Sequence, residues 1–497
     1  MSERRKKSAA KLLICLAIFA GISVGVFFGV QFVTKTGIFR VPGVVYYGEG
    51  LKEDELSKFH EIFTEEVDLD KDVKIDVREV LELPELAEGE YLYEVYVPVT
   101  DFYSSETNVG VENVEQLADE TFLNQNNIKL IPVSELDFSN KLLSINDNYY
   151  LGEFKTGAVY RIINFESEKF REEIWPLVSK MFNKTFPSSD TVLTFAQTGV
   201  TALSRGMNAK LKSVGGDATY FAEQIGPFLS AFDITHTSNE SSFTTAAHDR
   251  NICSDPRFID TLTAIGLDVV ELTGNHNQDC GNQAALDTID IYTEKGIKMV
   301  GGGKNATEAK APLELSEKGT NITMLAFNQS TGGATRGNTP GANQYYENVA
   351  AEQIKEAKER GDFVIVDVQY YECAAYASEY EDPICDAANS AAGDQIGFFR
   401  HLIDLGADVV VGTSAHQAQT FELYGDGVIY YGLGNLFFDQ IWWPGTTRSL
   451  ILSHYFHNGK LLQTKLVGTV YGKDMQTRLL DEDTMKWWIE RLVKVKP

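Results

Sequence analysis

The sequence predicts a layered α/β domain, preceded by a smaller mixed α/β region and by one N-terminal transmembrane helix. From residue 191 onward, short apolar strands alternate with helices and polar loops, which is typical of layered α/β domains. Upstream, strand-like runs are mixed with helical spacing, and residues near the N-terminus are uniformly apolar. The predicted parts are a basic cytoplasmic N-terminus (1–11), a transmembrane anchor (12–34), an accessory mixed α/β domain (36–185), the main domain (191–470) and a helical tail (471–497).

The predicted anchor is an uncharged run of 22 residues, Leu12 to Val33. At about 1.5 Å per residue it crosses a hydrocarbon core of about 30 Å. Five basic residues precede it, so we expect a single-pass protein of the cell membrane, with the N-terminus cytoplasmic and the bulk of the chain extracellular. The alternative is a cleaved signal peptide. The run is long for such a peptide, which favours an uncleaved anchor.

The charge of the chain narrows the choice of partners. It has 44 Lys and Arg residues against 71 Asp and Glu, a formal net charge of -27. Beyond residue 34 the net charge is -31. An acidic chain disfavours nucleic acid as a partner, because phosphates need a cationic surface. Its acidity suits divalent cations, or simply solubility. Outside the membrane run, Cys253, Cys280, Cys373 and Cys385 could form disulfides, in any of three pairings.

Apolar runs predict the elements of the chain. Predicted strands lie at 41–47, 91–99, 128–133, 191–197, 268–274, 322–327, 362–369, 407–412, 427–439 and 449–456. Predicted helices lie at 51–66, 167–185, 220–232, 283–296, 395–406 and 481–495. Because ligand sites of α/β domains lie in the loops at strand ends, polar residues at those positions are the site candidates.

Four segments place polar side chains at predicted strand ends. They contain His236, Asn239 and Glu240 (233–242), Asn275, His276 and Asp279 (274–281), Gln369 and Glu372 (368–373), and His416 and Gln417 (411–419). Asn and His can bind a metal ion through a carbonyl oxygen and an imidazole nitrogen, or can hydrogen-bond an anionic ligand. Each segment alone is better explained by turn formation. Their repetition at strand ends favours one shared site.

Several of these segments carry a family resemblance. GNHNQDCG (274–281), SNE (238–240) and AHQAQTFELYGDGVIYYGLGNLFFDQ (415–440) resemble the bacterial capsule-synthesis CapA/PgsA family, and LSRG (203–206) resembles it less closely. The resemblance covers about residues 191–470. It implies a calcineurin-like metallophosphatase fold of two packed sheets flanked by helices. It also implies a membrane-anchored, outward-facing protein that works in capsule or poly-γ-glutamate production.

The chain departs from the family's pattern at its expected metal ligands. Val200 stands where an Asp is expected, and Gln369-Tyr370 stands for a His-Trp pair. Thr413-Ser414-Ala415-His416 stands for His-His-Pro-His. A two-metal hydrolase needs anionic or imidazole ligands around each ion, and valine has no lone pair to offer. The sequence therefore predicts at most one divalent metal ion (Mn, Zn or Mg), or a site that binds its ligand without metal.

The resemblance and the strand-end positions together assign roles to the candidates. Possible metal ligands are Glu240, Asn275, His276 and His416, of which Asn275, His276 and His416 are also the catalytic candidates. The ligand-binding candidates are Arg205, His236, Asn239, Gln369, Glu372 and Gln417. Three functions remain open: support of the synthesis, export or retention of an envelope polymer, with that polymer or its synthesis machinery as partner; metal-dependent phosphoester hydrolysis; and non-catalytic adhesion or scaffolding.

Overall fold

The computed structural model describes residues 39–41, 44–47, 73–82, 91–154, 156–165, 187–329, 332–370 and 394–494. The predicted anchor (12–34) and the predicted helices 51–66 and 167–185 fall outside these ranges. In the part of the chain that is described, no helix combines the length and the apolar character needed to cross a membrane. The chain divides into two compact units, the first within Met1–Val99, Asn108–Leu136 and Leu142–Pro187, and the second formed by Thr100–Thr107, Asp137–Lys141 and Ser188–Pro497.

The first unit is built on one sheet with the strand order β1-β2-β3-β9-β4-β6, and β7 pairs with β4. Its strands are β1 (Phe39–Val41), β2 (Val44–Tyr47), β3 (Val73–Val80), β4 (Tyr91–Asp101), β6 (Lys129–Pro132), β7 (Asn140–Leu142) and β9 (Val159–Phe165), with the short pair β5 (Asn108–Val109) and β8 (Ser144–Ile145). Its helices are α3 (Glu115–Ala118), α4 (Glu120–Gln125) and α5 (Tyr150–Glu153). Leu117, Ile128 and Leu143 pack in its small core. The predicted strands at 91–99 and 128–133 are confirmed as β4 and β6.

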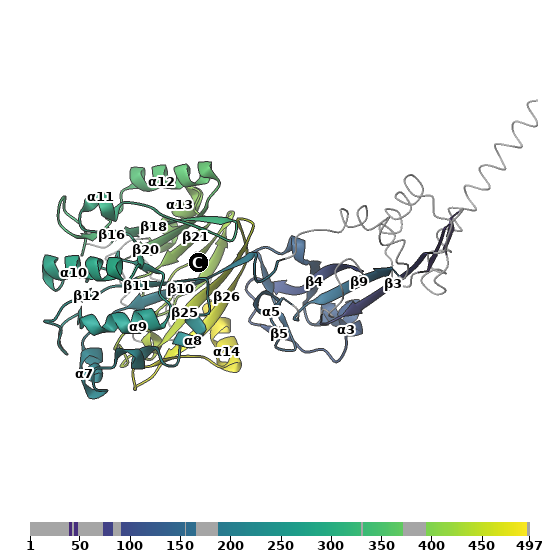
Figure 1. The fold of residues 1–497 in the computed structure, drawn as a ribbon, viewed down its shortest axis with the longest axis horizontal. Coiled ribbons are helices and arrows are strands. Elements are labelled where there is room, and N and C mark those ends of the chain that lie inside the picture. The colour runs from purple at the N-terminus through teal and green to yellow at the C-terminus, as the bar shows by residue number, and fades with distance from the viewer. Residues whose placement is uncertain are drawn as a thin grey trace, which may run out of the picture. The chain divides into compact units, whose positions relative to one another are not determined.

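The second unit contains two large sheets that pack face to face (Figure 1). The first sheet has the order β15-β14-β11-β10-β25-β26-β27, with β24 paired to β10. Its strands are β10 (Val192–Thr201), β11 (Ile234–Asn239), β14 (Val269–Glu271), β15 (Lys298–Val300), β24 (Asn435–Phe437), β25 (Arg448–His457), β26 (Lys460–Tyr471) and β27 (Thr477–Leu479). The second sheet has the order β17-β18-β20-β21-β23-β22. Its strands are β17 (Leu313–Glu317), β18 (Thr320–Asn328), β20 (Phe363–Gln369), β21 (Val409–Gly412), β22 (Phe421–Tyr424) and β23 (Gly427–Tyr430).

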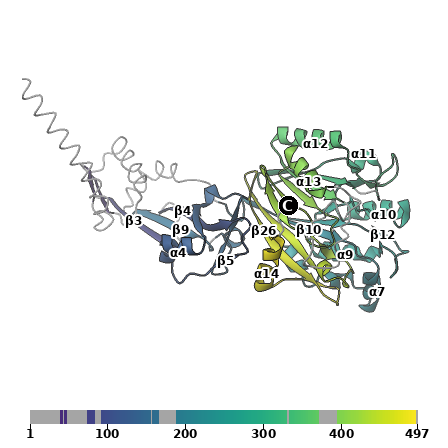
Figure 2. The ribbon, with the colours of Figure 1, turned by 180° about the vertical axis from the view of Figure 1, so that it is seen from behind.

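Helices cover the outer faces of both sheets, which gives the layered α/β architecture predicted from the sequence (Figures 1 and 2). α7 (Gly206–Ser213), α8 (Gly226–Leu229), α9 (Ile259–Ala264) and α10 (Gly281–Glu294) accompany the first sheet. α12 (Glu347–Arg360) and α13 (Gln395–Asp404) cover the second sheet. α11 (Ala306–Ala309) and α14 (Glu482–Leu492) complete the α-helices of the described residues.

The main core lies between the two sheets, because strands of both contribute apolar side chains to it. Phe195 and Val269 of the first sheet and Ile365 and Val411 of the second belong to one buried cluster. Trp488 of α14 joins the same cluster and is 5% exposed. The helix at the C-terminal end of the chain therefore closes part of the core.

Two sequence predictions were wrong at glycines. The single helix predicted at 220–232 is instead a 3₁₀ turn (Ala218–Ala222) followed by the short helix α8, which begins at Gly226-Pro227. Proline has no N–H to continue a preceding helix, so the chain restarts there. The single strand predicted at 427–439 is divided into β23 and β24, which belong to different sheets.

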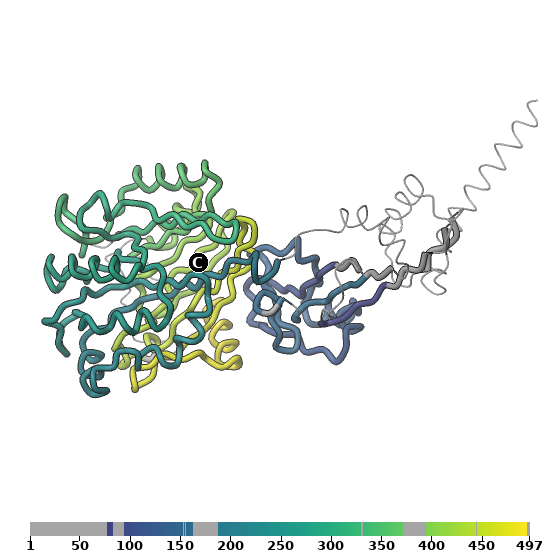
Figure 3. The backbone as a smooth tube through the Cα atoms, viewed as in Figure 1, coloured from purple at the N-terminus to yellow at the C-terminus, as the bar shows by residue number. Residues whose placement is uncertain are grey.

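The chain crosses between the sheets at Gly434, where the backbone has φ 79°. Gly434 O accepts a hydrogen bond from Val200 N at 2.9 Å. A Cβ on Gly199 would lie 2.1 Å from this oxygen, so the close approach requires glycine there. The tube in Figure 3 shows the teal β10 and the yellow-green β25 side by side, and these strands pair antiparallel from Val192 to Thr198.

Candidate functional site

The candidate site lies at the carboxyl ends of parallel strands. β10, β11, β14 and β15 run parallel in the first sheet, and β18, β20, β21 and β23 do so in the second. The loops after these strands carry most of the residues singled out in the sequence. This is the edge at which open α/β sheets bind ligands.

Three of these loops meet at Gln369, the last residue of β20. Its Nε2 donates to Asn275 Oδ1 at 3.1 Å and to Ser414 Oγ at 3.0 Å. Gln369 is buried, and its Oε1 accepts no hydrogen bond from the described residues. Gln369 thus joins the loop after β14 to the loop after β21. We call Asn275, Gln369 and Ser414 the amide cluster.

His416 is buried beside the amide cluster's loop and is oriented by Asn435 of β24. His416 Nδ1 lies 2.9 Å from Asn435 Oδ1, and Asn435 Nδ2 donates to Thr446 O at 3.1 Å. Because the carbonyl of Thr446 can only accept, the Asn435 amide is oriented with Oδ1 toward the imidazole. His416 Nδ1 therefore donates to Asn435 Oδ1.

His276 lies in the exposed part of the loop after β14. Its Nδ1 is 2.7 Å from Asp279 Oδ2, and the two side chains are 25% and 41% exposed. This contact spans three residues and orders the loop locally. The side chain of Gln417 packs against Gly445. A Cβ atom added to Gly445 would lie 2.1 Å from Gln417 Oε1. Glu372 lies outside the described residues.

The polar residues of β11 and of the turn that follows it lie in different places. Asn239 Nδ2 donates to Ser241 O at 2.8 Å and shapes the turn after the strand. Glu240 is buried against the loop after β14, because a Cβ on Gly274 would lie 2.7 Å from Glu240 Cα. His236 was expected at the strand end, but β11 continues through Asn239 and leaves His236 inside the sandwich. There its Nε2 lies 3.2 Å from Asp367 Oδ2.

Arg205 directly precedes the helix α7 and pairs with Asp439, a carboxylate that was not among the site candidates. Its Nε lies 2.8 Å and its Nη2 2.5 Å from Asp439 Oδ1. Asp439 Oδ2 also accepts from Gly206 N at 2.8 Å. Arg205 has φ 50°, an unusual value for a side chain of this size. The charge of Arg205 is therefore paired with that of Asp439 within the fold.

A buried polar network connects the two sheets behind the site. Gln197 Nε2 donates to Asp367 Oδ1 at 2.5 Å, and Gln197 Oε1 lies 3.2 Å from His454 Nε2. Burial lowers the pKa of His454 to about 3, with a further contribution from His236. Burial also raises the pKa of Glu271 to about 8, and repulsion from Asp367 and Glu240 adds to the increase. Near neutral pH the network thus holds a neutral imidazole and a mostly protonated carboxyl.

The described residues do not fit the two-metal centre that the resemblance implies. Among them, no group of three or more His, Cys, Asp or Glu side chains is arranged to hold a metal ion. Val200, at the position of the expected Asp, packs with Ala202 and Phe438 in a separate apolar cluster. Asn275 Oδ1 already accepts from Gln369. No step of a reaction is therefore assigned to a metal.

A disulfide connects two loops of this edge. Cys253 pairs with Cys280, 27 residues further along the chain. It joins the strand β13 (Cys253–Ser254) to the residue preceding α10. The sequence left three pairings open. Cys373 and Cys385 lie outside the described residues.

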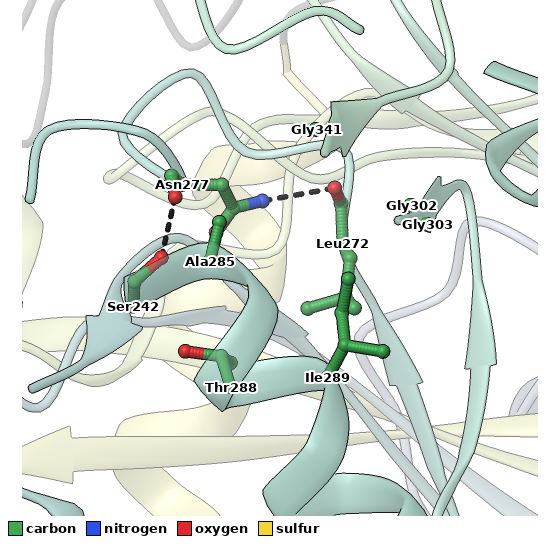
Figure 4. Close-up of a pocket in the computed structure, with 9 residues that line it drawn as sticks. All are labelled: Ser242, Leu272, Asn277, Ala285, Thr288, Ile289, Gly302, Gly303 and Gly341. Carbon is green, nitrogen blue, oxygen red and sulfur yellow. Dashed lines mark hydrogen bonds between the residues drawn. The ribbon is translucent and has the colours of Figure 1, made fainter. Parts of the chain in front are cut away.

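A small pocket beside α10 is too small to be the ligand site (Figure 4). Its volume is about 20 Å³, which accommodates about one water molecule. Asn277 Nδ2 donates to Leu272 O at 2.8 Å across its wall. It is lined by Ser242, Leu272, Asn277, Ala285, Thr288, Ile289, Gly302, Gly303 and Gly341.

The fold and this edge define a class: layered α/β proteins with a polar site at the carboxyl ends of their parallel strands. Residues 194–440 match the family model described as bacterial capsule synthesis protein PGA_cap. The capsule biosynthesis protein CapA of Bacillus anthracis is 25% identical over 319 residues, covering 59% of this chain and 74% of that protein. The PGA biosynthesis protein CapA of Bacillus subtilis is 26% identical over 280 residues, covering 54% and 70%.

A third relative is a probable polyglutamine synthesis accessory protein of Mycobacterium tuberculosis. It is 29% identical over 194 residues, which are 36% of this chain and 48% of that protein. Residues 194–440 are therefore similar to the CapA-like family of capsule synthesis proteins, from whose members the chain has diverged to 25–26% identity. The family predicted from the sequence motifs is confirmed.

Proposed function

We propose that this protein is a membrane-anchored, extracytoplasmic accessory protein that binds an amide-linked envelope polymer of the poly-γ-glutamate type. The names of the relatives supply the polymer class, since they refer to capsule, PGA and polyglutamine synthesis. The apolar run at 12–34 supplies the anchor. The Cys253–Cys280 disulfide supports an oxidising compartment, because cytosolic thiols are kept reduced.

The amide cluster is the observation that carries this proposal. Asn275 Oδ1 faces Gln369, so the two N–H groups of Asn275 Nδ2 point elsewhere and can donate. Gln369 Oε1 is a buried acceptor with no partner among the described residues, and such groups are costly to leave unpaired. One donor and one acceptor match the C=O and N–H of an amide bond.

Replacing Gln369 by alanine tests the proposal. Gln369→Ala removes the bridge between Asn275 and Ser414 and the unpaired acceptor, so we expect the affinity for poly-γ-glutamate to fall about tenfold or more. Isothermal titration of detergent-solubilised full-length protein measures this. Gln283→Ala is the matched control, because Gln283 lies on the exposed face of α10 and contacts Asp287. Unchanged affinity in Gln369→Ala would overturn the proposal.

The prediction that the protein binds at most one divalent metal ion has its own test. We expect full-length protein to release no phosphate from a phosphomonoester in Mn²⁺ or Zn²⁺, because the apolar cluster at Val200 replaces a bridging carboxylate. His276→Ala and His416→Ala serve as controls for any turnover that appears. Robust turnover abolished by either substitution would establish phosphoester hydrolysis instead. Two firmly bound transition-metal ions per chain, measured by elemental analysis, would contradict the depleted site.

A further inference from the structure

Two neighbouring tryptophans are exposed in the loop after β24. Trp442 is 54% and Trp443 is 37% exposed, and their rings form an edge-to-face pair with centroids 5.7 Å apart. Large apolar side chains are usually buried. Where several are exposed together, they commonly mark a binding surface. Tyr346, which precedes α12, is comparably exposed, at 52%, and the Lys310 Nζ lies 5.5 Å from its ring.

The tryptophan pair continues inward as a ladder of contacts between rings and a guanidinium group. The Arg205 guanidinium lies 5.6 Å from the Trp442 ring and 4.3 Å from the Phe438 ring. Phe438 in turn lies 5.0 Å from the His416 ring. The ladder therefore connects the exposed pair to the buried imidazole of the candidate site.

The loop that carries the pair is held in place by Thr446, which is buried. Thr446 Oγ1 donates to Trp443 O at 2.9 Å and also to Gln440 O. Thr446 O accepts from Asn435, the partner of His416. Because the backbone is fixed on both sides of the pair, the rings are preorganised, which lowers the entropy cost of binding.

The charge of this surface indicates an uncharged ligand. Residues 440–447 contain no ionisable side chain, although 23% of the chain is charged. Arg205 is neutralised by Asp439, so the ladder has no free cation for an anionic polymer. Indole faces carry negative potential and attract the C–H groups of an apolar ring face.

We propose that Trp442 and Trp443 bind the sugar rings of a neutral glycan. This surface would hold the protein on a glycan beside the polymer that occupies the amide cluster. The inference does not depend on the identity of that polymer, since none of its residues belongs to the amide cluster.

Titration of full-length protein with chitohexaose and cellohexaose, two neutral pyranose oligomers, tests this inference. The protein should be solubilised in an amine-oxide detergent, because maltoside head groups are themselves sugars. We expect saturable binding of at least one oligomer, with a change in tryptophan emission. Trp442→Ala and Trp443→Ala should each weaken it about tenfold, whereas Tyr346→Ala should not.

Three results would overturn the inference. The first is that neither oligomer binds, and the second is that both tryptophan variants bind as the wild type does. The third is that phosphatidylcholine vesicles or poly-γ-glutamate, rather than the oligomers, lose binding in both variants. Circular dichroism and thermal unfolding of each variant separate lost binding from lost folding, and both exposed sites should leave the melting temperature within about 2 °C of the wild type.

Discussion

Glu271→Gln should make the protein more stable at pH 7 by on the order of 3 kcal/mol and should remove most of the pH dependence of stability above pH 6.5. Glu271 is fully buried, and burial together with Asp367 and Glu240 raises its pKa to about 8 from 4.5. Thr273 N donates to its Oε1 at 2.5 Å, a bond that a glutamine oxygen can keep. The amide has no charge to desolvate, so the cost of ionisation disappears.

The direction of the effect follows from proton binding. Between pH 4.5 and 8 the unfolded chain has lost the Glu271 proton while the folded chain retains it. The unfolded state then binds fewer protons than the folded state. The contribution of Glu271 to the free energy of unfolding is therefore complete below pH 4.5 and falls as the pH rises toward 8. His454 has the opposite effect between pH 3 and 6.5, because its folded pKa is lowered to about 3. The His454 slope opposes that of Glu271 below pH 6.5 and fades above it. Near pH 8 the slope of Lys141 begins to oppose that of Glu271, because burial lowers the pKa of Lys141 to about 8. The contribution of Glu271 is therefore clearest near pH 7.

Urea unfolding at several pH values around pH 7 measures the prediction. The wild type should lose on the order of 1.4 kcal/mol per pH unit, and Glu271→Gln should lose much less. Glu352→Gln on the exposed face of α12 is the matched control and should follow the wild type within about 0.5 kcal/mol. If the free energies of unfolding of the wild type and of Glu271→Gln change equally with pH, Glu271 ionises normally in the folded protein.

Much of the second unit could be predicted from local sequence. Buried parallel strands such as β20 and β21 are continuous apolar runs, so their positions follow from composition alone. The division of 427–439 into β23 and β24 could not be predicted in this way, because both halves are apolar. What separates them is the approach of Gly434 to Gly199, which are far apart in sequence.

The candidate site shows the same limit. Placing Gln369 and Asn275 at strand ends was enough to expect them near one another, and their 3.1 Å hydrogen bond bears that out. The partners of Arg205 and His236 were missed, because the contact of Arg205 with Asp439 spans 234 residues and that of His236 with Asp367 crosses between the sheets. The GLGNLFFD motif contained the available signal, since it holds both Asn435 and Asp439.

Replacing both Cys253 and Cys280 by alanine should lower the free energy of unfolding by about 3.5 kcal/mol. The disulfide closes a loop of 27 residues, and removing it gives the unfolded chain back the entropy of that loop. Alanine is the suitable replacement because Cys253 is 2% exposed and a hydroxyl there would need a partner. Urea unfolding with and without reductant measures the effect. Reductant should lower the free energy of unfolding of the wild type to that of the variant. It should change the free energy of unfolding of the variant much less. If the wild type and the variant unfold at the same urea concentration under oxidising conditions, this disulfide does not stabilise the loops of the candidate site.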